Sequence, residues 1–102
     1  MRYTVTIPET HVCQSTCEGI AGDNYVIVLD GVVVLDREAN GVEATIDGKT
    51  VAYLPNNDAK VLLYFLSSNP TLRECAASLR LTRQPDGRYT VGVDSTVPLL
   101  PE

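Results

Sequence analysis

The sequence has no long apolar run and few basic residues. No stretch reaches the roughly 18 apolar residues of a membrane-spanning helix, and the opening MRYTVTIPET has no apolar signal segment. Lysine and arginine together number 8, against 13 aspartates and glutamates, for a net charge of -5. Binding of a whole surface to nucleic acid or to anionic lipid needs clustered basic residues. We therefore expect a cytoplasmic protein that has no membrane partner and does not favour nucleic acid.

Motifs for cofactors and catalysis are also missing. None of the 7 glycines forms the G-x-G-x-x-G or G-x-x-x-x-G-K loop that holds phosphate groups. The 3 cysteines are an odd number, which fits poorly with a secreted disulfide framework, although one bridge and one free thiol stay possible. We expect a protein that is not an enzyme and needs no cofactor.

The composition predicts one globular domain. The chain has 102 residues, of which 44% are hydrophobic and 21% are charged, as in ordinary folded domains. We expect a single domain over residues 1–102, with residues 94–102 as an extended tail.

Alternating apolar residues predict several strands. Tyr3, Val5 and Ile7 alternate with threonines, and Pro8 ends the strand. The dense runs Tyr25 to Leu29 and Val32 to Leu35 flank Asp30-Gly31, a pair typical of a tight hairpin turn. After Asn40-Gly41 the pattern predicts strands on both sides of a second such turn, Asp47-Gly48. These strands together form a meander.

The apolar spacing then becomes helical. A first helix is predicted from Asn57 to about Ser67, and Thr71 with Glu74 forms the capping box of a second. The second helix would place Leu72, Cys75, Ala76 and Leu79 on its inward stripe. A closing hairpin turns at Pro85-Asp86-Gly87. The predicted fold class is α+β, an antiparallel β-meander of about five strands with two consecutive helices and a C-terminal β-hairpin.

One cluster has the composition of a metal site. His11, Cys13, Cys17 and Cys75 are the three cysteines and one histidine that a tetrahedral structural zinc site uses, although no C-x2-C pair is present. A disulfide, such as Cys13 with Cys17, and free thiols are the alternatives. A Cys-His nucleophile pair would also need a residue that orients the histidine, and none is identifiable.

Four arginines could form a basic patch. Arg73 and Arg80 would share the solvent side of the predicted second helix, with Arg83 and Arg88 on the hairpin. Such a set is either an ordinary solvated surface or a patch for phosphate or an acidic partner.

Residues Asn40 to Pro70 resemble the start of the OmpR/PhoB-type winged-helix effector domain. The resemblance lies in the D-G turn and in Leu54, Asp58, Leu62, Leu66 and the Asn69-Pro70 pair. It implies a DNA-binding regulator. The sequence departs from the family where DNA is contacted, because only Leu81 to Arg88 separate the predicted second helix from the returning strand, which leaves no room for a recognition helix. No DNA-contact residue is carried over.

The valine-rich runs predict an interface. Side chains alternate along a strand, so we place Val26, Val28, Val33 and Leu35 on one face, and Tyr25, Ile27, Leu29, Val32 and Val34 on the other. Two short helices cover only one face. The other is expected to bind a partner protein or a second copy through Val26, Val28, Val33, Val34 and Leu35, unless the C-terminal hairpin and tail cover it.

The leading hypothesis is therefore a small non-catalytic protein-interaction module, a regulator or inhibitor that acts by binding a partner protein and self-associates. The alternatives are a winged-helix-like DNA-binding regulator and a zinc- or thiol-dependent module.

Overall fold

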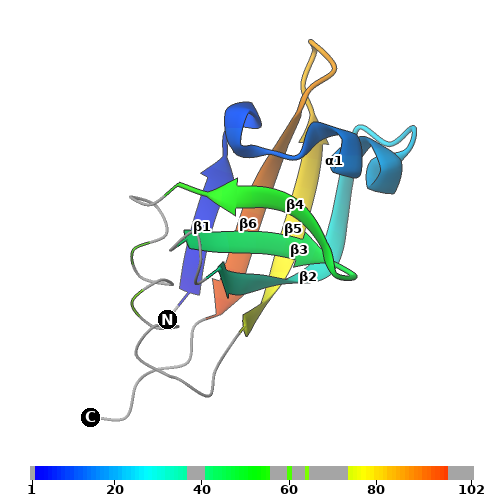
Figure 1. Cartoon of the computed structure of the whole chain (residues 1–102). Helices are drawn as coiled ribbons and strands as arrows, with labels where there is room; N and C mark the ends of the chain where they lie inside the picture. Colours follow the sequence, from blue (N-terminus) through cyan, green and yellow to red (C-terminus); the bar gives the residue numbers. More distant parts are fainter. Residues whose placement is uncertain (1, 37–40, 56–59, 61–63, 65–73, 97–102) are drawn as a thin grey trace.

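The computed structural model describes residues 2–36, 41–55, 60, 64 and 74–96. They form one antiparallel sheet of six strands in the order β1-β6-β5-β2-β3-β4 (Figure 1). The elements are β1 Arg2–Ile7, the 3-10 helix η1 Glu9–His11, α1 Gln14–Ala21, β2 Val26–Asp36, β3 Gly41–Ile46, β4 Lys49–Leu54, β5 Glu74–Arg83 and β6 Tyr89–Thr96. No helix within these residues is both long and apolar enough to cross a membrane.

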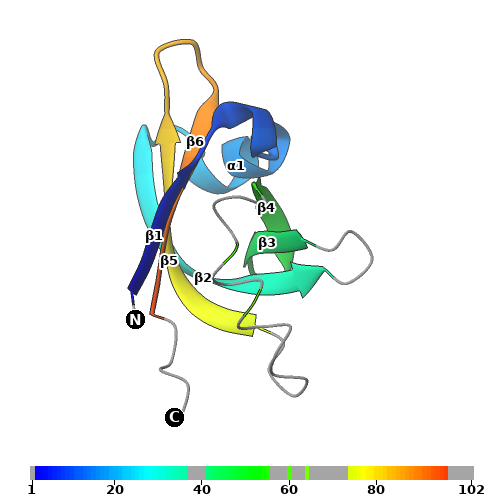
Figure 2. The same ribbon diagram turned by 90° about the vertical axis from the view of Figure 1, so that its left-hand side faces the viewer.

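The sheet curls back over itself around the long strand β2. The first part of β2 pairs with β5, and its last part pairs with β3. Figure 2 shows the result edge-on, with β1, β6 and β5 in one layer, β3 and β4 in the other, and α1 between the layers at one end. The core fills the space between the layers. Its fully buried side chains include Ile7, Cys17, Val33, Val42, Val51, Leu79, Leu81, Val91 and Val93.

Several local predictions are confirmed. Residues 2–7 form a strand with Ile7 buried and the threonines exposed, and Pro8 follows its end. The turn between β3 and β4 is at Asp47 and Gly48, both with positive φ (50° and 78°). The turn before β6 contains Gly87 at φ 86°, and the Gly87 N–H donates to the Gln84 carbonyl.

The predicted hairpin at Asp30-Gly31 is wrong, because β2 continues without interruption through both residues. Gly31 serves a different purpose there. A Cβ on it would lie 2.4 Å from the Thr45 carbonyl oxygen and 2.7 Å from Leu79 Cδ1. Glycine inside a strand marks a close approach of another backbone, and here the approach is that of β3 as the sheet curls.

The α+β meander with two consecutive helices is also wrong, because the second predicted helix is strand β5. Cys75, Ala77, Leu79 and Leu81 are buried, while Glu74, Ala76 and Arg80 between them are exposed. The apolar residues of this segment fit both the period of a helix and the period of a strand. Pairing with β2 on one side and with β6 on the other makes the segment a strand. The fold is mostly β.

Two further predictions lie largely beyond what the structure describes. Of the helix expected from Asn57 to Ser67, only Lys60 and Tyr64 are among the described residues. The tail is described only to Thr96. No helix was predicted around Cys17, but residues Gln14–Ala21 form α1, whose inward side chains Cys17 and Ala21 are one turn apart. Gly22, at φ 58°, follows its end.

Candidate functional site

No helix or strand of the described residues covers the outer face of the four strands β1, β6, β5 and β2. The inward side chains of these strands, such as Leu79 and Val91, are fully buried. On the opposite side, Val26 and Val28 are 52% and 51% exposed. By strand alternation this outer face consists of Thr4, Thr6, Val26, Val28, Asp30, Ser78, Arg80, Thr82, Thr90, Gly92 and Asp94. No helix of the described ranges covers it, since α1 lies between the layers (Figure 2).

The register of the sheet orders this face into rows. One row crosses the four strands as Val28, Arg80, Gly92 and Thr6, each directly opposite the next. The adjacent row is Asp30, Ser78, Asp94 and Thr4. Arg80 is the single cation of these two rows. It lies between Val28 and Gly92 in its own row, and the adjacent row contains the carboxylates of Asp30 and Asp94.

A hollow of about 260 Å³ lies over Gly92. Thr4, Thr6, Val28, Ser78, Arg80 and Asp94 surround it. The backbone does not require glycine here, because Gly92 is not among the positive-φ residues and the register around it is regular. Neither does packing, because a Cβ would make ordinary contacts, at 3.6 Å from Arg80 Cβ. The consequence of this glycine is the hollow itself.

The predicted interface residues do not share one face. Because β2 is continuous, Val26, Val28 and Val34 alternate with Val33 and Leu35. Val33 is fully buried and Leu35 packs partly against the core. Grouping these two with Val26 and Val28 was wrong, since it depended on a hairpin at residues 30–31.

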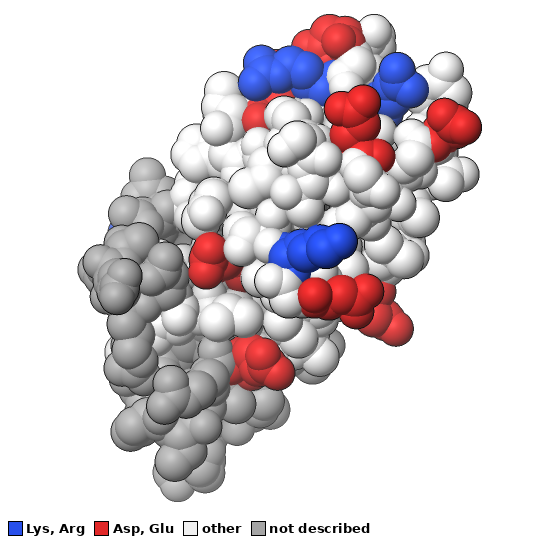
Figure 3. Space-filling model, turned by 45° about the vertical axis from the view of Figure 1, so that its right-hand side comes forward, with Lys and Arg blue, Asp and Glu red and all other residues white. Residues whose placement is uncertain are grey.

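The predicted basic patch is dispersed. Arg80 is exposed on the outer face, whereas Arg83, three positions on, emerges from the opposite side of β5 and lies over the Tyr25 ring at 5.5 Å. Arg88 Nη1 is 3.4 Å from a Glu9 carboxylate oxygen. Arg73 lies outside the described residues. On the face drawn in Figure 3, basic and acidic groups lie side by side rather than in broad patches of one sign.

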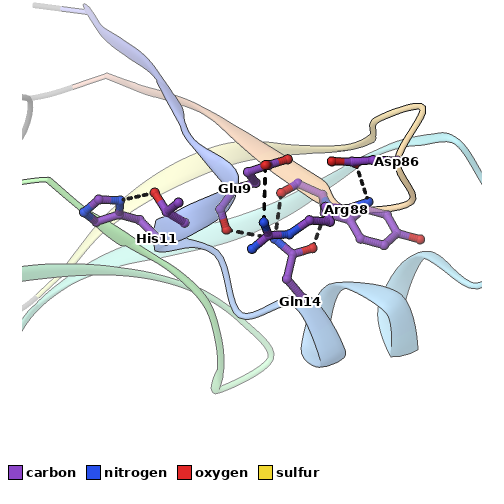
Figure 4. Close-up of polar contacts among 7 residues, drawn as sticks. Glu9, His11, Gln14, Asp86 and Arg88 are labelled. Atoms are coloured by element: carbon purple, nitrogen blue, oxygen red, sulfur yellow. Dashed lines mark hydrogen bonds and ion pairs between the residues drawn. The ribbon is translucent and has the colours of Figure 1, made fainter.

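The residues of the predicted metal cluster are all described, and the structure does not bring them together as one ligand set. Cys13, Cys17 and Cys75 are free thiols. In the described part of the chain no group of three or more histidine, cysteine, aspartate or glutamate side chains could hold a metal ion. His11 is exposed and its Nδ1 lies 3.1 Å from Thr10 Oγ1 (Figure 4). Cys75 is buried on β5, opposite Val33.

The thiols are protected rather than activated. Burial raises the pKa of Cys17 to about 11, with a smaller contribution from Cys13, and its Sγ donates to the Val51 carbonyl at 3.7 Å. Burial also raises the pKa of Cys13, helped by the charge of Glu43, and that of Cys75. A nucleophilic cysteine needs the opposite change, a lowered pKa that yields thiolate at neutral pH.

Gln14 makes three hydrogen bonds that link the start of α1 to η1 and to β6 (Figure 4). Its Nε2 donates to the carbonyls of Glu9 at 2.9 Å and Tyr89 at 3.0 Å, and its Oε1 accepts from the Tyr89 N–H at 2.6 Å. The amide thus pairs with Tyr89 as a neighbouring strand would. This arrangement holds η1 and the start of α1 against β6, and it engages both polar atoms of the Gln14 amide.

Sequence reasoning missed both the Gly92 hollow and the place of Arg80. The available signal was the alternation Thr90, Gly92, Asp94 opposite buried Tyr89, Val91 and Val93, which puts a glycine on the outward side of a regular strand. The place of Arg80 on the outer face was missed because the residues of β5 were predicted to form a helix.

Comparison with protein-family models, with curated proteins and with solved structures gave no match.

Proposed function

We propose that this protein is a non-catalytic interaction module that acts by binding another protein through the outer face of its sheet. The observation that carries the proposal is the exposure of Val26 and Val28, at 52% and 51%, on a sheet face that no described element covers. Contiguous apolar side chains on a surface mark sites of association, because leaving them in water is unfavourable.

The surroundings of these valines also fit an interface. Hydroxyl side chains of Thr82 and Ser78 and the charge of Arg80 lie on the neighbouring strand β5. Protein interfaces combine an apolar centre with a polar rim, and arginine is enriched in them. The raised pKa values of all three cysteines count against a catalytic use of the thiols.

Site-specific photo-crosslinking tests the proposal. A benzophenone amino acid replaces Val28 on the outer face or, as the matched control, Tyr53, an apolar residue of β4 that is 47% exposed. We expect the probe at 28 to yield a discrete protein adduct in the cells that make the protein, and the probe at 53 to yield none or a much weaker one. Adducts at neither position, or equal adducts at both, would contradict the proposal.

A further inference from the structure

The outer face has a self-complementary arrangement of charge and shape. We infer that a second copy of this chain docks on it, with Arg80 of each copy lying in the Gly92 hollow of the other. The inference rests on the proposed function, because it names the partner of that same face.

The register supports this pairing. In this arrangement the two copies are related by a two-fold axis that is parallel to the strands and midway between β5 and β6. The axis sets β5 of each copy against β6 of the other, and β2 of each copy against β1 of the other. Arg80 and Gly92 are direct partners in the sheet, so the axis places each Arg80 over the second copy's Gly92. Two packed sheets lie about 10 Å apart. A long side chain of one copy spans this gap and enters the hollow of the other copy.

The charges agree with the same axis. The second copy's Asp94 is two residues along β6 from its Gly92, about 6–7 Å away, within reach of the Arg80 guanidinium. Asp30 faces the second copy's Thr4, and Val28 faces its Thr6, so no two like charges stand directly opposite one another. A carboxylate and a guanidinium that meet between two sheets form a charge-assisted hydrogen bond.

The neighbouring alternative fails on charge. An axis along β5 itself would set Arg80 against the second copy's Arg80, and Asp30 against its Asp94. Like charges facing each other in an interface disfavour that arrangement. The favoured axis is therefore the one that sets β5 of each copy against β6 of the other.

The size of the face sets the expected strength. Four strands about 4.8 Å apart, over the six residues of β1, span roughly 400 Å² per copy. Stable complexes bury about 800 Å² per partner. The pair is therefore weak, and its dissociation falls within the micromolar to millimolar concentration range that sedimentation covers.

Sedimentation equilibrium with charge-swapped chains tests the inference. The natural chain is expected to form a concentration-dependent dimer. Arg80→Glu and Asp94→Arg should each weaken it at least about tenfold, since each sets like charges together. An equimolar mixture of the two variants should dimerise as the natural chain does, because both contacts in the mixed pair then join opposite charges. Arg88→Glu, at an arginine that pairs with Glu9 off the outer face, is the control and should leave dimerisation unchanged.

A second variant guards against misfolding of the charge swaps. Gly92→Val fills the hollow with a strand-favouring residue and should abolish pairing at an unchanged or higher melting temperature. The inference is overturned if the natural chain stays monomeric to millimolar concentration, if Gly92→Val dimerises normally, or if the mixture of folded variants fails to pair. A monomer that still gives an adduct with a different protein at position 28 refutes self-pairing and leaves the proposed function standing.

Discussion

At the scale of single residues, Gln14 joins parts of the chain that are 75 positions apart. Replacing it with alanine leaves the Tyr89 N–H and the carbonyls of Glu9 and Tyr89 without these partners. We expect Gln14→Ala to lower the free energy of unfolding by about 1–3 kcal/mol. The melting temperature should fall by roughly 4–8 °C for each kcal/mol.

Differential scanning calorimetry checks this prediction. The control is Ser15→Ala, at the exposed neighbouring position of α1, which should change the melting temperature little. Gln14→Glu should be intermediate, because a carboxylate still accepts from the Tyr89 N–H but cannot donate to either carbonyl. Equal stability of Gln14→Ala and Ser15→Ala would show that the three hydrogen bonds contribute nothing net.

The buried thiol of Cys17 is expected to lower the free energy of unfolding at alkaline pH. Its pKa is raised from 9.0 to about 11, so the folded state holds the thiol proton more tightly than the unfolded chain does. This difference has no effect on stability below pH 9.0, and the free energy of unfolding then falls as the pH rises from 9.0 towards 11. Urea titrations at both ends of this range measure the fall.

Cys17→Ala is the control for this pH dependence. The variant loses stability at every pH from the cavity it creates, so the comparison is between slopes rather than absolute values. Its free energy of unfolding should fall less steeply over the alkaline range than that of the natural chain. Identical slopes would mean that ionisation of Cys17 is not linked to folding.

At the scale of elements, two strand glycines have opposite roles. A Cβ at Gly31 would meet the Thr45 backbone oxygen and Leu79 Cδ1 at 2.4 Å and 2.7 Å, whereas one at Gly92 meets nothing closer than 3.6 Å. Gly31→Ala must push β3 away and should cost about 1–3 kcal/mol or more. Gly92→Ala should raise the stability of the monomer by about 0.4–1 kcal/mol, because alanine restricts the unfolded chain.

Urea denaturation of the two alanine variants, at concentrations where the chain is monomeric, compares these effects directly. If Gly31→Ala is as stable as the natural chain, the close packing of β3 on the bend of β2 does not limit the fold. Destabilisation by Gly92→Ala would mean that a constraint on that strand has been overlooked.

The elements also show what local sequence can predict. The Asp47-Gly48 turn was predictable, because both residues take the positive φ that this pair favours. Asp30-Gly31 has the same pair type and is no turn, since tertiary packing around Gly31 decides its conformation. In β5, Ala76 would face inward in a helix and outward in a strand, and only pairing with β2 and β6 distinguishes the two.

At the scale of the whole molecule, the strand order was the least accessible feature. The sequence predicted strands that pair with their neighbours in the chain, as β3 with β4 and β5 with β6 do. It contains no local signal that β1 pairs with β6 or β2 with β5. The exposed apolar residues of the candidate site were partly foreseen in Val26 and Val28, but the face they belong to needed that long-range pairing. Arg80 and Gly92 became neighbours only through it.

The pairing of β1 with β6 has a consequence for how the chain folds as it is made. Arg2 to Ile7 bond to Val91 to Thr96, so the first strand finds its partner only after the last one has been synthesised. Ribosomes add about 5–20 residues per second, which leaves β1 without that partner for on the order of 5–20 s. During this interval an uncharged stretch, Tyr3 to Ile7, composed of strand-forming residues, is available to other chains. Until β6 has been made, this first strand is therefore open to pairing with another chain instead of with its own sheet.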